Sequence, residues 1–147
     1  MAYWRLYYHI VWATKNRAEL ITPEIAPEMF GYLTQKGTSK DTYVHAVGGY
    51  LDHVHVVASV HPKIAVATYV HDIKGSTSHH INRIARPGGQ SLYFQDSYGV
   101  VSFGARHLGW VIEYVRTQEA RHKANNLIAR LERWSENNEL PPPPERG

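Results

Sequence analysis

The order of periodic segments constrains the fold of this chain more than any other feature of its sequence. Apolar residues alternate in some segments and recur at helical spacing in others. The predicted strands are 3–14, 43–47, 51–60 and 98–103, and the predicted helices are about 22–36, 64–84 and 108–131. This order predicts an α+β chain with a ferredoxin-like βαββαβ core, in which helices cover one face of a four-stranded antiparallel sheet. The last helix is an addition to that core, and Asn125-Asn126 is a candidate break in it.

Length and composition fit one domain. The chain has 147 residues, which allow a single hydrophobic core, and we expect residues 1–137 to form it. The segment 138–147 contains four consecutive prolines and is expected to be a disordered tail. Cysteine is absent, which excludes disulfides and thiolate ligands. With no signal peptide and no apolar run of membrane-spanning length in view, a cytoplasmic location is expected.

The segment Asp52-His53-Val54-His55 is the first candidate site. Residues two apart on a strand point to the same side, so His53 and His55 project together from the predicted third strand. Two neutral imidazoles placed in this way are suited to hold a divalent metal ion. A pair of hydrogen-bonded sheet histidines without a ligand would have the same spacing.

The last predicted helix carries Tyr114 and Gln118, which share a face because they lie four residues apart. A tyrosine hydroxyl is a weak nucleophile at its ordinary pKa of about 10. A metal ion that polarises a target phosphate would assist its attack, and Gln118 could offer the same ion its carbonyl oxygen. An amphipathic helix with a packed tyrosine and a solvated glutamine is the simpler interpretation of this pair alone.

Two further segments offer contacts to nucleic acid. Lys74, Ser76 and Ser78 in the second predicted helix could bind phosphates without reading sequence. Lys15 and Arg17 form a basic loop after the first strand, and the formal charge of +3 permits a phosphate-rich partner. Each segment alone is equally consistent with an ordinary solvated surface.

Together these segments resemble the single-tyrosine HUH transposases, which comprise the insertion-sequence 200/605-type enzymes and their REP-associated relatives. The matching parts are residues 8–17, 52–55, 73–78 and 98–102 and the Tyr114/Gln118 pair, in the order that the family has them. The resemblance covers about residues 3–123. Phe94 stands where the family pattern leads us to expect tryptophan, and the segment after Asn125 carries no recognised motif.

The resemblance implies an activity and a set of partners. It implies a DNA transposase in which His53, His55 and Gln118 hold Mg²⁺ or Mn²⁺ and Tyr114 attacks single-stranded DNA, leaving a 5′-phosphotyrosine. Hairpin ends of a mobile element are the implied substrate. A homodimer is implied too, and in the family the histidines of one subunit typically meet the tyrosine of the other.

Two other functions stay open at this point. A non-catalytic, domesticated ferredoxin-like protein that binds single-stranded nucleic acid would fit the same fold, although it need not keep the tyrosine and both histidines. A histidine-rich metal-binding regulator is a weaker alternative, because it would need a closed ligand set with no nucleophile beside it.

Overall fold

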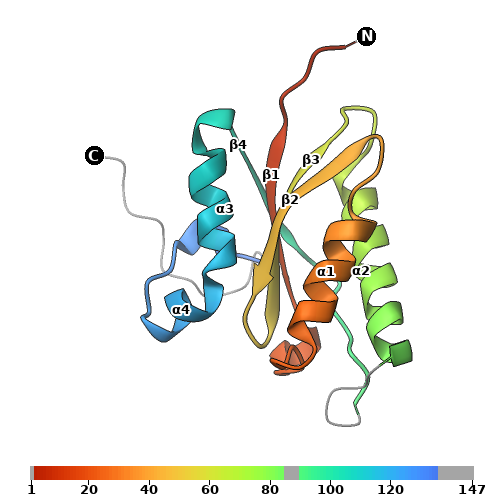
Figure 1. Cartoon of the computed structure of the whole chain (residues 1–147), viewed down its shortest axis with the longest axis vertical. Coiled ribbons are helices and arrows are strands. Elements are labelled where there is room, and N and C mark those ends of the chain that lie inside the picture. Colours follow the sequence, from red (N-terminus) through yellow and green to blue (C-terminus); the bar gives the residue numbers. More distant parts are fainter. Residues whose placement is uncertain (1, 85–89, 136–147) are drawn as a thin grey trace.

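The computed structural model of the chain describes residues 2–84 and 90–135 (Figure 1). Its strands are β1 (Tyr7–Ala13), β2 (Thr42–Gly49), β3 (His53–Val60) and β4 (Gly99–Phe103). Its α-helices are α1 (Ala26–Lys36), α2 (Val66–Ile84), α3 (Leu108–Arg116) and α4 (Gln118–Lys123), with short 3₁₀ helices at Lys15–Arg17, Ala105–His107 and Ala129–Leu131. The strands form one antiparallel sheet in the order β2-β3-β1-β4, which confirms the ferredoxin-like core. The predicted tail, 138–147, lies outside the described residues.

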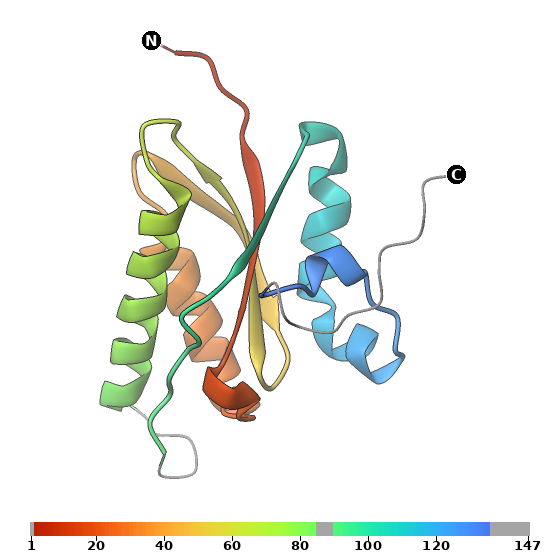
Figure 2. The ribbon, with the colours of Figure 1, turned by 180° about the vertical axis from the view of Figure 1, so that it is seen from behind.

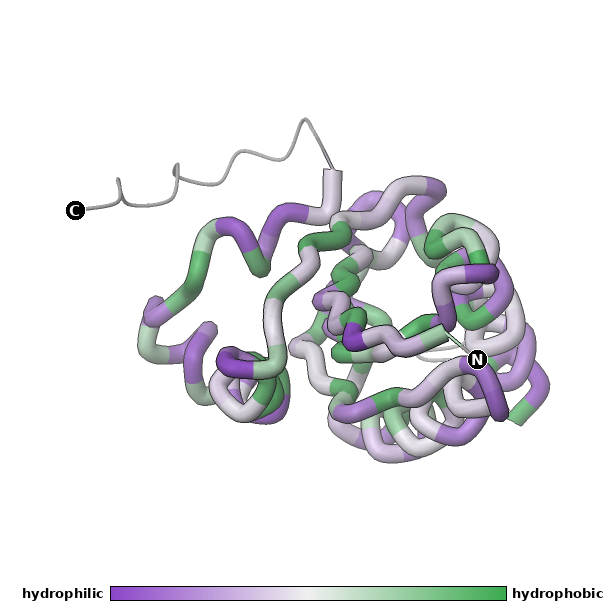
Figure 3. The backbone as a smooth tube through the Cα atoms, turned by 90° about the horizontal axis from the view of Figure 1, so that it is seen from above, coloured by the Kyte–Doolittle hydropathy of each residue, from purple (hydrophilic) through white to green (hydrophobic). Residues whose placement is uncertain are grey.

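Helices cover both faces of this sheet. Helices α1 and α2 lie side by side on one face, and α3 and α4 lie on the other (Figures 1 and 2). Seen from above, α3 and the segment that follows it stand across the strands from the α1/α2 layer (Figure 3). Among the described residues, no helix is both long and apolar enough to cross a membrane.

Side chains of β3 point alternately to the two faces of the sheet, so the strand contributes to both helical layers. Val54 and Val56 belong to the large apolar core beneath α1 and α2, together with Ile10 and Trp12 of β1. The other face of β3 carries His53 and His55 toward α3 and α4. The two histidines therefore sit in the middle of the molecule, between the sheet and the added helices.

The first strand is shorter than the sequence pattern predicts. We expected it to span 3–14, but β1 begins at Tyr7, opposite Phe103 of β4. The register with β3 begins one residue later, at Tyr8 and Ala58. Residues 2–6 pair with no strand among the described residues, so alternation alone overestimated the length of the strand.

The helical segment predicted for 108–131 is not one continuous helix. Helix α3 ends at Arg116, and Thr117 takes a non-helical conformation before α4 begins. The hydroxyl of Thr117 donates to the carbonyl of Glu113, a local bond that competes with regular helix geometry. Helix α4 ends where Asn125 adopts a positive φ of 53°, and the amide of Asn126 bonds back to Arg121. The expected break at Asn125-Asn126 is therefore confirmed, and a second break occurs at Thr117.

Two glycines allow backbone to approach the sheet closely. A Cβ atom on Gly48 of β2 would lie 1.8 Å from the carbonyl oxygen of Val115, in α3. A Cβ atom on Gly99 of β4 would lie 1.8 Å from the carbonyl oxygen of Arg133. Any larger residue would push α3 or the 128–134 segment away from the sheet, so both glycines set the geometry above the histidines.

Candidate metal and nucleophile site

The site is built around the two strand histidines. Both are almost fully buried, with exposed fractions of 1% for His53 and 0% for His55. Their rings lie 5.0 Å apart, centroid to centroid, as expected for residues two apart on one face. The Nδ1 atom of His53 lies 2.9 Å from Oδ1 of Asp52, and Nδ1 of His55 lies 2.7 Å from Nε2 of His9. Their Nε2 atoms therefore face α3 and α4.

Tyr114 and Gln118 reach the same point from the helical side. Although α3 and α4 are separate helices, the four-residue spacing survives the break, and the Gln118 amide donates to the Tyr114 carbonyl at 3.1 Å. Oε1 of Gln118 lies 3.2 Å from Nε2 of His53. The Tyr114 ring stands edge-on to His55, with 6.1 Å between centroids. All four residues expected at a site are thus neighbours within one chain, and their chemical roles stay predictions.

Two residues that we did not predict complete the cluster. His122 of α4 places Nε2 3.0 Å from Oε1 of Gln118. Glu132, which follows the last 3₁₀ helix, is 1% exposed and places Oε1 3.4, 3.3 and 3.2 Å from Nε2 of His53, His55 and His122. Its other oxygen, Oε2, accepts a short hydrogen bond from the Tyr114 hydroxyl. One carboxylate therefore joins the tyrosine to the three imidazoles.

Sequence reasoning could have found one of these two residues. His122 lies four residues after Gln118, which is one helical turn, so the face shared by Tyr114 and Gln118 points to it. Glu132 offers no such signal. It comes from a segment without regular secondary structure, and its position depends on how the chain returns to the sheet after α4.

Burial and charge act in opposite directions at this cluster. Burial lowers the pKa of His53, but hydrogen bonds to Asp52 and Glu132 outweigh it and raise that pKa to about 9. Burial keeps the pKa of His55 below its ordinary value. Burial works against ionised Glu132, yet the nearby imidazoles, His55 first, hold its pKa far below the usual range. Burial and then the charge of Glu132 raise the pKa of the Tyr114 hydroxyl.

The donor set fits a small divalent cation. One ligand atom from each of His53, His55, His122 and Glu132 lies within 4.8 Å of all the others. Ligands bound to one ion at about 2.1 Å lie roughly 3.0–3.5 Å from each other, close to the spacing seen around Glu132 Oε1. Within the part of the chain that the structure describes, the buried Nε2 atom of His55 makes no hydrogen bond of regular geometry, although Oε1 of Glu132 lies 3.3 Å from it. The lone pair of this nitrogen is the kind of ligand that such an ion requires.

The segment 128–134 covers this cluster. The backbone amide of Ile128 donates to the Tyr114 hydroxyl at 2.9 Å, and Tyr114 is 0% exposed. The ring of Trp134 stacks on His53 with 5.5 Å between centroids. In this arrangement the tyrosine and the histidines are closed to a large substrate.

The predicted basic loop lies at the edge of this cover. Arg17 is exposed, donates from Nε to Oδ2 of Asp52 at 3.0 Å, and lies over the Trp134 ring. Lys15 is exposed beside it in the same 3₁₀ helix. A role in DNA binding stays a prediction for both, and Arg17 also supports the histidine cluster through Asp52.

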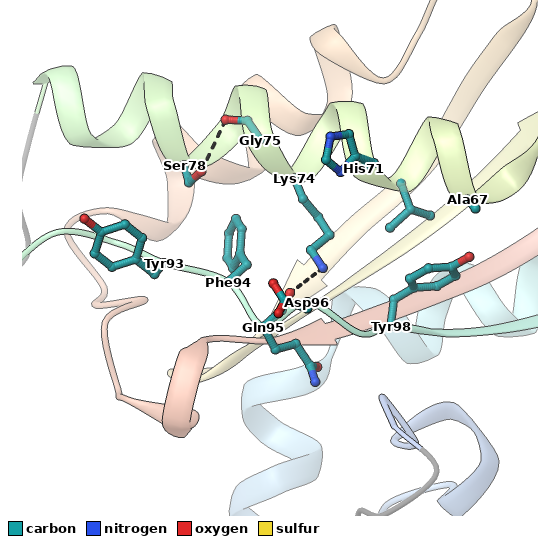
Figure 4. Close-up of a pocket in the computed structure, with 11 residues that line it drawn as sticks. Ala67, His71, Lys74, Gly75, Ser78, Tyr93, Phe94, Gln95, Asp96 and Tyr98 are labelled. Carbon is teal, nitrogen blue, oxygen red and sulfur yellow. Dashed lines mark hydrogen bonds between the residues drawn. The ribbon is translucent and has the colours of Figure 1, made fainter.

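The other predicted DNA contacts lie on the opposite face of the sheet. Lys74 and Ser78 line a cavity of about 380 Å³ between α2 and the segment that leads to β4 (Figure 4). The Lys74 ammonium is largely buried and donates to the carbonyls of Gln95 and Ser97. Ser76 lines a different cavity, on the α1 side of α2. The structure therefore does not bring these three residues into one patch, nor next to the histidines.

Comparison with known proteins agrees with the fold and with the motifs. Residues 2–118 match the family model described as "Transposase IS200 like". This chain belongs to the IS200-like transposase family. The family match ends at Gln118, so His122 and Glu132 lie beyond the matched residues.

Individual relatives are distant. The ISDra2 transposase TnpA of Deinococcus radiodurans is 27% identical over 75 residues, which are 51% of this chain and 54% of that protein. The chain thus matches about half the length of this curated relative.

Two solved structures are similar in fold. One is a crystal structure of a Deinococcus radiodurans R1 protein assigned as a transposase; its TM-score is 0.63 at 21% identity, covering 78% of this chain and 92% of that one. The other is a REP-associated tyrosine transposase bound to a REP hairpin, with a TM-score of 0.57 at 13% identity, covering 88% of this chain and 78% of that one. At such identities these structures bear on the fold alone.

Proposed function

We propose that this IS200-like transposase cleaves and rejoins single-stranded DNA through a covalent 5′-phosphotyrosine at Tyr114, with Mg²⁺ or Mn²⁺ as cofactor. The observation that carries the proposal is the convergence of Tyr114, Gln118 and the histidine pair on one carboxylate, Glu132. An ordinary amphipathic helix would leave the Gln118 side chain in solvent, whereas here it is 1% exposed and contacts a strand histidine.

The metal would be held by His53 and His55, with Gln118 as the predicted third ligand and with His122 and Glu132 close enough to join them. When bound, a divalent cation supplies the Lewis acid that polarises the scissile phosphate and offsets the charge of the transition state. A ligand set rich in imidazole suits Mn²⁺ better than Mg²⁺, which prefers oxygen ligands.

The chain's own residues perform the exchange of esters. The Tyr114 oxygen attacks the scissile phosphorus, a new tyrosine–phosphate bond forms, and the bond to the 3′ oxygen breaks. The phenolic proton leaves Tyr114, and the departing 3′ oxygen ends as a hydroxyl. Because one phosphodiester replaces another, a second 3′ hydroxyl can reverse the reaction and join strands without a nucleotide cofactor.

The segment 128–134 must move before DNA can enter. Tyr114 is fully buried, and its hydroxyl is bonded to both Ile128 and Glu132, so a phosphodiester has no access to it in the closed arrangement. Lid movements of this kind commonly precede chemistry in enzymes. We therefore propose that the closed form precedes substrate binding.

The proposed DNA substrate is a hairpin end of a mobile element. A fold-level neighbour is a REP-associated tyrosine transposase bound to a REP hairpin, which supports this choice. We also propose a homodimer with an interface above about 1,000 Å². Sedimentation at micromolar concentration should show a species of twice the 16.8 kDa chain mass, and a species of 16.8 kDa alone would contradict it.

A labelled single-stranded hairpin incubated with Mn²⁺ or Mg²⁺ tests the chemistry. On a denaturing gel, the wild-type chain should form a covalent protein–DNA band, and Tyr114→Phe should form none while still binding the hairpin. Tyr98→Phe is the matched control, because Tyr98 is partly buried and packs against the core of the α1/α2 layer, away from the histidines. A band that persists in Tyr114→Phe would place the nucleophile elsewhere. Hairpin binding with no covalent band under any condition would favour the binding-only function.

A further inference from the structure

We infer that His9 and Asp52 are positioning residues that fix the ring orientation and tautomer of the two strand histidines, so that both Nε2 atoms face one metal ion. The inference rests on the metal site of the proposed function. It assigns a positioning role to two residues that lie outside the predicted ligand set of His53, His55 and Gln118.

His9 is placed by the sheet register. On β1 it lies opposite Val57 of β3, while Val11 lies opposite His55. His9 and His55 are therefore diagonal neighbours on the same face, close enough for long side chains to meet. Both rings are buried, and Nε2 of His9 lies 2.7 Å from Nδ1 of His55.

The bond between His9 and His55 carries one proton, and its position decides whether His55 can bind a metal. If Nδ1 of His55 holds the proton and donates it to His9, Nε2 of His55 keeps a free lone pair. The Nε2 atom is buried, makes no hydrogen bond of regular geometry among residues 2–84 and 90–135, and lies 3.3 Å from Oε1 of Glu132, so a cation between the two would use that lone pair. His9 thus acts as the acceptor that keeps the proton on the far side of the ring.

Asp52 performs the same task for His53 by a different route. It directly precedes His53, after a turn in which Leu51 has a positive φ of 59°. Its Oδ1 accepts from Nδ1 of His53 at 2.9 Å, and its Oδ2 accepts from Nε of Arg17 at 3.0 Å. A carboxylate cannot donate this bond, so the proton must be on Nδ1, and Nε2 is left to face the centre.

The two positioning residues, His9 and Asp52, differ in charge, so their effects on metal binding can be measured separately. A neutral imidazole supports His55, while an anchored carboxylate supports His53 and makes that ring a stronger donor to a cation. Removal of such outer hydrogen bonds typically weakens metal binding by about 10–100-fold. We expect that range for either residue, and a larger loss when both are removed.

The test measures Mn²⁺ binding to the full chain without DNA, by electron paramagnetic resonance of free Mn²⁺. His9→Leu removes the acceptor and should raise the Mn²⁺ Kd about 10-fold or more. His9→Gln should restore much of the affinity, because its amide oxygen can occupy the position of Nε2. Asp52→Ala should weaken binding in the same range, and Asp52→Asn should weaken it less. The matched control is His80→Gln, since His80 pairs with Glu28 and Tyr32 in the α1/α2 layer.

A second readout separates positioning from mere stability. Two-bond ¹H–¹⁵N spectra of the metal-free protein report which ring nitrogen of His55 carries its proton. The wild-type and His9→Gln chains should show it on Nδ1, and His9→Leu should shift it toward Nε2. If His9→Leu fails to fold, His9→Asn serves instead, because its shorter amide does not reach His55.

Each outcome has a distinct meaning. An unchanged tautomer and a Kd within twofold of wild type in the His9 and Asp52 variants would overturn the inference. If the wild-type chain itself does not bind Mn²⁺, the metal site of the proposed function fails instead. Loss of affinity in His80→Gln as well would indicate a general loss of structure, and would also overturn the positioning role.

Discussion

The Tyr114 hydroxyl donates a hydrogen bond to Oε2 of Glu132, a residue 18 positions later in the chain, while Oε1 of the same carboxylate faces three histidines. The nucleophile that we propose and the metal site that we propose are therefore joined by one side chain. That side chain belongs to the segment that also closes the site. The chemistry of Tyr114 and the closure of the site should consequently respond to the same substitution.

Glu132→Gln should lower the pKa of Tyr114. Burial and the negative charge of Glu132 both raise that pKa, and the amide keeps the shape of the side chain while it removes the charge. A neighbouring charge typically shifts a pKa by about 1–3. Spectrophotometric titration of tyrosinate, taken as a difference from Tyr114→Phe, should show a fall of at least about one. Glu119→Gln changes an exposed carboxylate of α4 and should leave the titration of Tyr114 as it is.

The metal-free protein should lose stability as pH rises from about 6.5 to 9. The folded state holds the proton of His53 more tightly than the unfolded state, because its pKa is raised from 6.5 to about 9. This contribution is complete below pH 6.5 and disappears as pH passes 9, and it amounts to on the order of 3 kcal/mol at most. Urea unfolding in EDTA at several pH values measures it. Asp52→Asn should flatten the dependence, because it removes the carboxylate whose hydrogen bond to His53 raises the pKa of that ring; an equally steep fall in Asp52→Asn would contradict this assignment.

Lys74→Met should destabilise the fold more than it weakens DNA binding. The Lys74 ammonium is tied to the carbonyls of Gln95 and Ser97, so its removal leaves these acceptors without their charged donor. Such a loss costs about 1–3 kcal/mol. Thermal unfolding and hairpin affinity, measured on the same variant, should show a lower Tm with affinity changed less than about threefold. A large loss of hairpin affinity at unchanged Tm would indicate instead that Lys74 contacts DNA.

The strand and helix pattern could be predicted because local periodicity determines it. The faces of β3 follow from alternation, so His53 and His55 were bound to lie on one side of the sheet. The four-residue spacing placed Tyr114 and Gln118 on the same face, one turn apart, even though they lie on the separate helices α3 and α4. These four residues meet in the structure because each depends on short-range geometry and on the order of the elements.

What the sequence did not reveal depends on long-range packing. Glu132 reaches the histidines because the chain turns back at Asn125 and runs against β4, where Gly99 leaves room for Arg133. The break at Thr117 was missed because threonine is only mildly unfavourable in a helix. Lys74 appeared to be a surface cation, since no local pattern shows that the segment leading to β4 will cover it.

Gly99→Ala should open the 128–134 segment, which carries Glu132, without substituting any residue of the cluster. A Cβ atom there would lie 1.8 Å from the carbonyl oxygen of Arg133, and backbone cannot yield at that distance without moving the 128–134 segment. Overpacking of this kind costs about 1–3 kcal/mol, so the segment should detach before the sheet unfolds. Hydrogen exchange of residues 128–135 should become faster while β1 and β3 keep their protection. Gly104→Ala is the matched control, because nothing lies within 4 Å of its new methyl group. If segment 128–134 is the barrier to DNA, Gly99→Ala should form the covalent band with hairpin DNA faster than the wild-type chain, and a slower reaction at unchanged Mn²⁺ affinity would show that the cover assists catalysis.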